Sequence, residues 1–366
     1  MASRTVWIGT YPAAGIGTPS GRGEGIYRCE IDLATGRLAS GERVVETPAP
    51  SFLALRPDGR VLYAVDEDVA GQVAAFRVHD ERLEPLGTVP SGGQTPCHLL
   101  VDGDRLYVAH YGDGTLGVLR LASDGSFVDG APQLLTGSGS GPDPLRQRGP
   151  HAHFVALAPG GRVLVVDLGA DLIRRYARTP EGLAAAGVAA RLPPGTGPRH
   201  LAFDGRASSG DRREQGARLA YVTGELDATV HVLAWDPATD TGEVVQTLPA
   251  MTSLPGSMPP GRIASAPGRT ADIAPSPSHV VTAGSDLVVA VRGVGTLSRF
   301  AIGVDGLLTH RTDQPLRTTT PRHFAVVGGW TVVAEQVPGA VAVLDRGGTV
   351  VSSCDVPSAA CIVPML

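Results

Sequence analysis

Polar and ionisable side chains recur at one kind of position in this 366-residue sequence, where a short apolar run begins or ends. Those at the ends of the runs are Thr10, Asp66, Glu67, His110, Asp167, Glu225, Arg292, Glu335 and Gln336. Those near the beginnings are Ser51, Cys97, His153, Arg199, Ser278 and Arg322. Carboxylates and histidines move protons, and a guanidinium is a permanent cation that grips anions bidentately. The set could therefore perform acid–base chemistry on a small anionic molecule.

The sequence contains no lysine, so all 31 residues counted as lysine or arginine are arginine. It contains no asparagine either. A lysine Schiff base, a P-loop lysine, a serine–lysine dyad and an asparagine-built oxyanion hole are therefore excluded. Any fixed cation in a site must be arginine, protonated histidine or a metal.

Motifs for metal or nucleophilic chemistry are weak. His151-Ala-His153 has the HxH form, but alternation along a single strand explains this spacing equally well. The sequence has no HExxH motif and no GxSxG nucleophile elbow. We expect neither a metal nor a cofactor.

The apolar runs belong to a sequence repeat. Its copies begin at Pro50, Pro96, His151, Pro198, Pro277 and Pro321. Each copy holds β-branched runs separated by Gly, Asp and Pro turns, which is typical of strand–turn–strand structure. A further strand follows a hairpin signal such as TPEGL at 179–183. Four antiparallel strands per copy predict the blades of a β-propeller.

The two ends of the chain supply a seventh blade. VWIGTY and GIYRCEID match second and third strands, and PSAACIVPM at 357–365 offers the missing first strand. We therefore predict an all-β, seven-bladed propeller, closed by pairing of the N- and C-terminal strands within one blade. Residues 1–366 would form a single domain, with the Pro/Gly-rich segment 251–277 as a candidate lid.

Composition restricts the partners. A net charge of −5 without a basic cluster argues against nucleic acid. The sequence shows neither a signal peptide nor a run long enough to span a membrane, and its four cysteines lack a CxxC pair. We expect a cytoplasmic protein with free buried thiols. A closed propeller needs no partner to cover its edges, so a monomer is compatible with the sequence, which leaves the oligomeric state open.

The propeller geometry predicts where a site would lie. The start of the innermost strand and the end of the second strand meet on one face, around the central channel, so the positions above converge there. The recurring Pro-x-His motif (His98, His200, His279 and His323) favours a structural role such as inter-blade hydrogen bonding. His153 departs from that motif by one position, which favours a functional role. Asp66 and Asp167 could instead cap turns.

Several segments together resemble a known family. They are WIGTY, IDLATGRL, LRPDGRVLYAVDE, GPHAHFVALAPGGRVLVVDLGAD, GTGPRHLAF, VTGEL and VAVRG. The chain resembles the bacterial lactonase family of seven-bladed propellers, which includes propeller-type 6-phosphogluconolactonases and fungal-type muconate-lactonizing enzymes. The resemblance implies catalytic roles for His153, Arg199, Glu225 and Arg292. The family often has asparagine just before the last residue of the second strand, where this chain has Asp66, Gly224 and Val291.

The first functional hypothesis is hydrolysis of a sugar lactone, or of a related small lactone, that bears an anionic group. Glu225 or His153 would activate water if burial tunes its pKa toward neutrality. Arg199 and Arg292 would hold the anionic group and stabilise the oxyanion. Further substrate contacts are expected from Arg322, His110, Asp66, Glu67, Asp167 and Gln336.

Two alternatives remain open. The same four catalytic residues could support a metal-independent muconate-type cycloisomerase or lyase, or a specialised biosynthetic enzyme. A non-catalytic interaction propeller would instead place aromatic and apolar residues around the channel, where this sequence places mostly polar ones.

Overall fold

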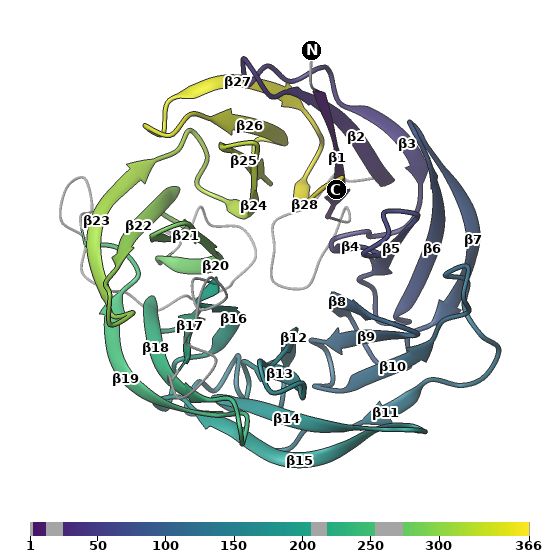
Figure 1. The fold of residues 1–366 in the computed structure, drawn as a ribbon, viewed down its shortest axis with the longest axis vertical. Coiled ribbons are helices and arrows are strands. Elements are labelled where there is room, and N and C mark those ends of the chain that lie inside the picture. Colours follow the sequence, from purple (N-terminus) through teal and green to yellow (C-terminus); the bar gives the residue numbers. More distant parts are fainter. Residues whose placement is uncertain (1–2, 12–24, 206–217, 253–273, 366) are drawn as a thin grey trace. The chain divides into compact units, whose positions relative to one another are not determined.

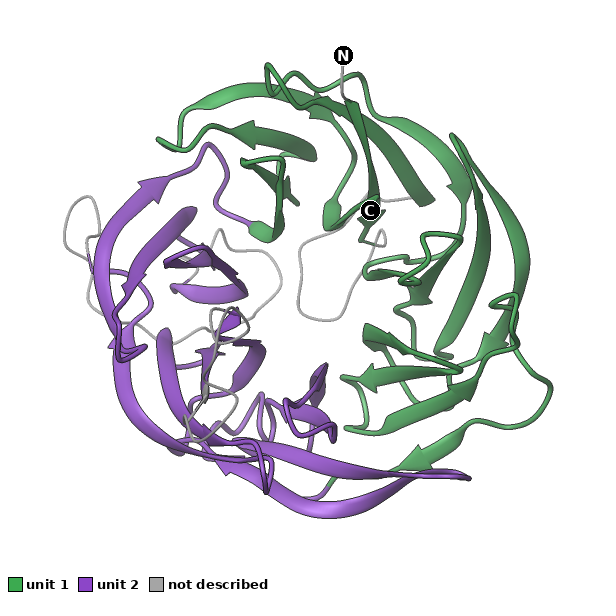
Figure 2. Ribbon diagram, in the orientation of Figure 1, with its two compact units in different colours: residues 1–137, 321–366 green, residues 138–320 purple. Residues whose placement is uncertain are grey.

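The computed structural model describes residues 3–11, 25–205, 218–252 and 274–365, which divide into two compact units. Figure 2 distinguishes the first unit, residues 1–137 with 321–366, from the second, residues 138–320. Within the described ranges both units consist of four-stranded sheets, and every neighbouring pair of strands is antiparallel. The strands carry the labels of Figure 1.

The first unit contains four sheets. The sheet made of both chain ends has the order β28 (Ala359–Pro364), β1 (Ser3–Thr10), β2 (Gly25–Asp32) and β3 (Glu42–Glu46). The second sheet consists of β4 (Leu53–Leu55), β5 (Val61–Asp66), β6 (Gln72–His79) and β7 (Arg82–Pro90). The third consists of β8 (Pro96–Asp102), β9 (Arg105–His110), β10 (Leu116–Arg120) and β11 (Gln133–Leu135). The last is β24 (Pro321–Val327), β25 (Trp330–Glu335), β26 (Ala340–Leu344) and β27 (Val350–Asp355).

The second unit contains three sheets of the same pattern. They are β12 (Ala152–Leu157), β13 (Val163–Asp167), β14 (Leu172–Thr179), β15 (Gly182–Arg191), then β16 (Pro198–Phe203), β17 (Arg218–Gly224), β18 (Thr229–Asp236), β19 (Thr241–Pro249), and β20 (Ser276–Ala283), β21 (Asp286–Arg292), β22 (Thr296–Ile302), β23 (Leu308–Pro315).

Seven four-stranded sheets confirm the all-β, seven-bladed propeller predicted from the repeats. The predicted closure is also present, because β28 pairs antiparallel with β1 and places Ile362 opposite Ile8. No helix in the described ranges is long and apolar enough to cross a membrane. Most of the candidate lid at 251–277 lies outside the described residues, so that expectation stays a prediction.

Burial follows the position of a strand within its blade. The second strand β13 is buried along its whole length, whereas the outer strand β19 alternates between partly buried and exposed residues. In the second unit, one apolar cluster joins the first two sheets around Trp235, and another joins the last two around Phe300. Second strands therefore read as continuous apolar runs because neighbouring sheets cover both of their faces.

Six innermost strands have a register irregularity near their start, and in β28 the extra residue is Ala360. In β12, Ala152 pairs with Asp167 and Phe154 with Val166, so His153 is the extra residue. Corresponding irregularities lie at Cys97 in β8, Arg199–His200 in β16, Ser278 in β20 and Arg322 in β24. Bulges re-aim a side chain away from the regular pleat. Apart from Ser51, which precedes β4, the residues noted at the strand starts therefore lie where the backbone departs from regular strand pairing.

Candidate active site

The second unit brings one carboxylate and three guanidiniums together. Glu225, directly after β17, is only 5% exposed. Its Oε2 lies 2.7 Å from Arg199 Nε and 3.0 Å from Arg292 Nη2, and its Oε1 accepts a 2.8 Å hydrogen bond from Arg146 Nη2. We call Glu225, Arg146, Arg199 and Arg292 the arginine clamp. Its members come from two strand ends, one bulge and one loop.

The arginine clamp decides the protonation state of Glu225. Burial alone would raise the pKa of this carboxyl group, but the guanidiniums of Arg292, Arg146 and Arg199 together lower it well below its usual value. The expectation that burial tunes the Glu225 pKa toward neutrality is therefore wrong. Glu225 is a permanent carboxylate and a weak base at neutral pH.

His153 stands beside the clamp at the bulge of β12. It is 7% exposed, and its positively charged form would lower the pKa of Glu225, so the two groups lie within electrostatic reach. The ring of His153 packs edge-on against the ring of His200, with 5.5 Å between centroids. Bulge and ring contact together fix the direction of the His153 imidazole.

Arg199 is hydrogen-bonded to His200, which is in turn hydrogen-bonded to His279. Arg199 Nη1 lies 3.0 Å from His200 Nε2, and His200 Nδ1 lies 2.8 Å from His279 Nδ1. A guanidinium only donates, so His200 Nε2 must accept and His200 must carry its proton on Nδ1. His279 Nδ1 then accepts from His200. These hydrogen bonds link β16 to β20, which is the inter-blade contact expected for the Pro-x-His motif.

Arg292 is held by the strand that pairs with its own. It ends β21, opposite Ser276 at the start of β20. Arg292 Nη2 donates to Ser276 Oγ at 2.8 Å. The same Nη2 lies 3.0 Å from Glu225 Oε2, so one nitrogen of Arg292 contacts both the hydroxyl and the carboxylate.

Arg146 is a member of the clamp that the sequence analysis missed. It lies in the loop before β12, where Asp143 Oδ1 accepts the backbone N–H groups of Leu145 and Arg146 at 2.8 and 2.9 Å. The neighbouring Arg148 is exposed and donates to a backbone carbonyl of the same loop. Loop arginines two residues apart look alike in sequence, so only the fold separates their roles.

A buried polar network anchors that loop. Gln147 is fully buried, and its Nε2 donates to Leu168 O at 2.9 Å and to Asp171 Oδ1 at 2.8 Å. Asp171 also accepts the backbone N–H groups of Gly195 and Gly197 at 2.7 and 2.8 Å. The loop before β12 and the loop before β16 are thus tied through one carboxylate. These two residues also escaped the sequence analysis.

Gly197 allows the close approach of β16 to Glu225. Its φ is +57°, and an added Cβ would lie 2.3 Å from Leu226 Cγ. Its carbonyl accepts the Glu225 N–H at 2.9 Å. Glycine is needed here because any side chain would clash and disfavour the left-handed backbone.

Asp167, a predicted substrate contact, is turned into the protein. It is fully buried, and its Oδ1 accepts the N–H groups of His151 and Gly169 at 2.8 and 3.1 Å. Its Oδ2 lies 2.9 Å from Arg174 Nη2. Burial raises the pKa of Asp167, although Arg174 opposes that change. These contacts fix the segment that leads into His153, which agrees with the turn-capping alternative.

His110, another predicted contact, has both ring nitrogens engaged within the first unit. Nδ1 lies 3.0 Å from Thr115 O, which requires a proton on Nδ1, and Nε2 lies 2.9 Å from Ser91 Oγ. The ring is fully buried, and burial lowers its pKa. His110 is therefore a neutral group that joins the end of β9 to Ser91 in the loop between β7 and β8.

The first unit holds a second polar cluster at the corresponding strand positions. Glu67 accepts hydrogen bonds from Tyr11 Oη, at 2.8 Å, and from Ser51 Oγ. The Arg322 guanidinium lies 4.2 Å from the centroid of the Tyr11 ring, and its Nη1 lies 3.5 Å from Gln336 Oε1. The structure thus brings together the predicted contacts Glu67, Arg322 and Gln336.

Asp66 lies next to Glu67 but carries different chemistry. Burial, assisted by the nearby charge of Asp68, raises the pKa of Asp66 to about 6. This carboxyl group therefore titrates just below neutral pH.

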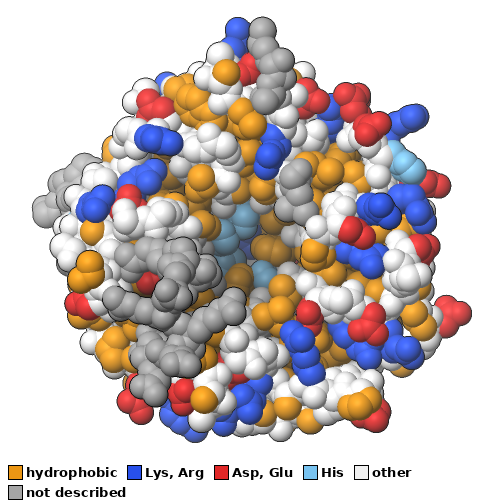
Figure 3. Space-filling model, in the orientation of Figure 1, with side chains coloured by type: hydrophobic (Ala, Val, Ile, Leu, Met, Phe, Trp, Pro, Cys, Tyr) orange, Lys and Arg blue, Asp and Glu red, His pale blue; other side chains and the backbone are white. Residues whose placement is uncertain are grey.

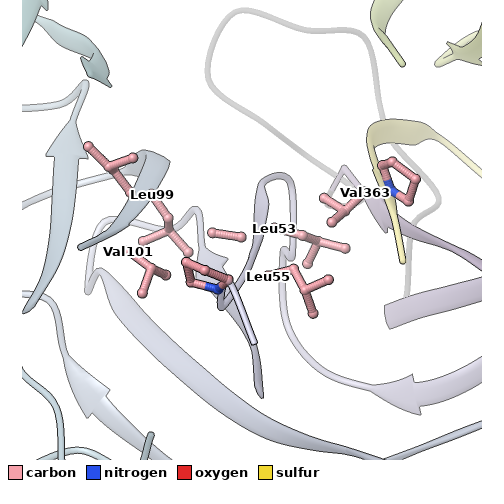
Figure 4. A pocket seen from close by; sticks show the side chains of 9 residues that line it. Leu53, Leu55, Leu99, Val101 and Val363 are labelled. Atoms are coloured by element: carbon pink, nitrogen blue, oxygen red, sulfur yellow. The ribbon is translucent and has the colours of Figure 1, made fainter. Parts of the chain in front are cut away.

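A hollow of about 590 Å³ lies elsewhere in the first unit, between the inner strands β4, β8 and β28. Figure 4 shows Leu53, Leu55, Leu99, Val101 and Val363 around it. Its lining contains only Leu, Ala, Pro and Val residues. It offers no group for acid–base chemistry or anion binding.

The described residues give no candidate metal site. Within them, no group of three or more His, Cys, Asp and Glu side chains is placed to hold a metal ion. On the face drawn in Figure 3, acidic and basic side chains of the described surface are interspersed. The expected absence of metal and cofactor stays a prediction.

A seven-bladed propeller with a buried, arginine-rich polar group is the class of protein that this fold and these side chains define. The family model described as lactonase, 7-bladed beta-propeller matches residues 5–364. The chain belongs to this family.

Named relatives are similar at modest identity. The chain is 28% identical over 251 residues to 6-phosphogluconolactonase of Bacillus subtilis, covering 67% of this chain and 66% of that protein. It is 29% identical over 215 residues to a Lactococcus lactis protein, covering 58% and 59% of the two chains. These matches span less than two thirds of either relative's length.

A solved structure is similar over nearly the whole chain. The periplasmic gluconolactonase of Pseudomonas aeruginosa superposes with a TM-score of 0.83 at 27% identity, covering 100% of this chain and 99% of that one.

Proposed function

We propose that this protein hydrolyses a small lactone that bears an anionic group, such as a phosphorylated sugar lactone. The observation that carries the proposal is the arginine clamp beside His153. The family membership and the names of the gluconolactonase relatives support the same reaction class.

The charge of the clamp favours an anionic substrate. Three guanidiniums face one carboxylate, so positive charges outnumber negative ones by two among these four side chains. Guanidiniums stay charged when desolvated and bind phosphate or carboxylate bidentately. A substrate carboxylate would supply one negative charge and a phosphate monoester about 1.5 to 2 at neutral pH, and the tetrahedral intermediate would add one more.

His153 is the proposed general base, because Glu225 is too weakly basic for that role. Its imidazole would take a proton from water as the water oxygen attacks the lactone carbonyl. Arg199 or Arg292 would stabilise the resulting oxyanion. The ring C–O bond then breaks, and His153 returns the proton to the leaving oxygen, which yields the hydroxy acid.

Glu225 would act electrostatically in this scheme. Without its charge the three guanidiniums would repel one another, so the carboxylate holds them in a single arrangement. Arg146, with about a third of its side chain exposed, is the clamp arginine most open to an incoming anion. Arg322, Glu67, Gln336 and Asp66, all in the first unit, stay predicted substrate contacts, whereas His110 and Asp167 would act by positioning.

A substrate panel tests the proposal. Purified protein would be assayed with EDTA present against phosphorylated and neutral δ- and γ-lactones, with spontaneous hydrolysis subtracted. We expect turnover of anionic lactones, and about a 100-fold or greater loss in His153→Gln and Glu225→Gln. Arg148→Ala is the control and should retain wild-type activity.

Unsaturated dicarboxylates in the same panel separate hydrolysis from cycloisomerisation. Conversion of a dicarboxylate without any lactone hydrolysis would replace our proposal with the cycloisomerase alternative. No turnover of any panel member, by folded protein, would contradict the proposed reaction class. The cytoplasmic location stays a prediction that cell fractionation would check.

A further inference from the structure

Two cysteines far apart in sequence meet in the first unit. Cys29 in β2 and Cys354 in β27 have their sulfur atoms 3.4 Å apart. β2 belongs to the sheet that contains both chain ends, and β27 is the outer strand of another sheet of the same unit. The two sulfur atoms are therefore in van der Waals contact between blades, and both thiols are free.

The pair combines a reachable nucleophile with a buried partner. Cys354 is partly exposed, whereas Cys29 is 1% exposed. The hydrogen bond with Cys29 lowers the pKa of the Cys354 thiol, and a backbone hydrogen bond from Gly41 lowers it further against the effect of burial. The same contact raises the pKa of Cys29. Cys354 is thus the thiol that ionises first, and ionised thiols react with oxidants.

The other two cysteines lack this arrangement. Cys97 and Cys361 are both buried, and their sulfur atoms contact the backbone carbonyls of Ala109 and Leu53 at 3.7 and 3.9 Å. Burial raises the pKa of Cys361 to about 12. The chain therefore contains its own controls for selective oxidation.

We propose that Cys29 and Cys354 form a peroxide-driven disulfide that joins the blade of the chain ends to its neighbour. The Cys354 thiolate attacks one oxygen of hydrogen peroxide, which breaks the O–O bond and, after protonation, gives a sulfenic acid and one water. The Cys29 sulfur then displaces the sulfenic oxygen, which leaves as a second water when the thiol proton is transferred. Two thiols are oxidised, one peroxide is reduced, and an S–S bond forms.

The disulfide would restrain the part of the fold where the ring of blades is closed. A bond between residues 29 and 354 closes nearly the whole chain into one loop, and long loops lose the most unfolded-state entropy. The bond requires the sulfur atoms to approach to about 2.05 Å, a movement that side-chain rotation can supply. We expect the oxidised protein to melt at least about 3 °C higher than the reduced protein.

Peptide mapping tests the disulfide directly. Folded full-length protein would be treated with hydrogen peroxide, unfolded, alkylated and digested without reductant. We expect a peptide pair linked through Cys29 and Cys354 that separates on reduction, with Cys97 and Cys361 alkylated. Cys97→Ser should keep the linked pair, and Cys29→Ser should leave a Cys354 sulfenic acid that dimedone labels.

Two results would overturn the proposal. The first is that Cys29 and Cys354 remain alkylatable after peroxide treatment, or that a different pair is linked. The second is that the linked protein melts no higher than the reduced protein, which would remove the stabilising role. Cys354→Ser, melted with and without peroxide, controls for other oxidative effects and should show no rise.

Discussion

At the scale of single residues, the protonation of Glu225 determines how the site is interpreted. A buried glutamate alone would be expected to hold its proton more tightly, as a candidate acid or base. Three guanidiniums within 3.0 Å reverse that tendency. The proton-transfer role therefore passes to His153, and Glu225 becomes the fixed counter-charge of an anion site.

Arg146 provides a residue-scale prediction with a matched control. We expect Arg146→Ala to lower kcat/KM for an anionic lactone by about 10- to 100-fold, mainly through KM, because one charge-assisted contact to the substrate is lost. Arg148→Ala, two residues away and exposed, should change kcat/KM less than about twofold. Steady-state kinetics measure both, and equal effects would contradict the separate role of Arg146.

The histidine chain behind Arg199 provides a second residue-scale prediction. His200→Leu removes the acceptor of the Arg199 hydrogen bond and should lower kcat by about tenfold. His200→Gln restores a polar acceptor and should recover part of that loss. Melting temperatures of both variants control for stability. If glutamine rescues stability but not kcat, His200 does not orient Arg199.

At the scale of elements, the β-bulge explains why the same repeat position carries chemistry in blade after blade. His153, Ser278 and Arg322 are extra residues in their strands, and Arg199 lies in the same irregularity. A regular strand would direct each residue at this position into one face of the sheet. The bulge turns it aside without disturbing the apolar alternation that follows.

The end of β5 provides a prediction about pH. The pKa of Asp66 is raised to about 6 in the fold, against roughly 4 in an unfolded chain. Between these values the folded state binds more protons, so the contribution of Asp66 to stability is lost as pH rises from 4 to 6. We expect Asp66→Asn to be more stable, relative to wild type, at pH 7.5 than at pH 4.5.

Urea unfolding at the two pH values measures this difference. Asn keeps the shape of the side chain and cannot ionise, so the comparison isolates one carboxyl group. The same comparison for Asp58→Asn, at an exposed turn between β4 and β5, reports the effect of removing a surface carboxylate. If the free energy of unfolding differs between wild type and Asp66→Asn by the same amount at both pH values, the raised pKa of Asp66 is contradicted.

At the scale of the whole molecule, the pairing of β28 with β1 joins the two ends of the chain. Ile362 and Cys361 are buried in that strand. Ending the chain at residue 356 would expose these contacts and leave β1 as an open sheet edge. We expect the truncated protein to aggregate or unfold, whereas removal of residue 366 alone should be neutral. Size-exclusion chromatography and circular dichroism distinguish these outcomes, and a folded, soluble truncated chain would contradict the closure.

The fold was predictable from the sequence because the same strand-and-turn pattern occurs in several copies of the repeat. Turn residues, apolar runs and the Pro-x-His motif recur, so the strands assigned in one copy can be checked against the other copies. The missing first strand was likewise implied by PSAACIVPM at the end of the chain. The bulges were not predicted, because they depend on the register between strands.

The candidate site was predictable where it coincides with the repeat and hidden where it does not. His153, Arg199, Glu225 and Arg292 occupy repeat positions, and the structure groups all four. Arg146 lies in the loop before β12, outside the repeated segments of the sequence. The state of Glu225 could not be inferred either, because it depends on three partners that are distant in sequence.

The most direct test of the central claim removes the phosphate group from the substrate and, separately, the guanidinium of Arg199 from the protein. The measurement is kcat/KM for 6-phosphogluconolactone and for unphosphorylated gluconolactone, in wild type and in Arg199→Gln. We predict that wild type prefers the phosphorylated lactone by at least about tenfold, and that Arg199→Gln loses at least about 100-fold of its activity while remaining folded. Equal activity on both lactones, or an unaffected Arg199→Gln enzyme, would contradict the account.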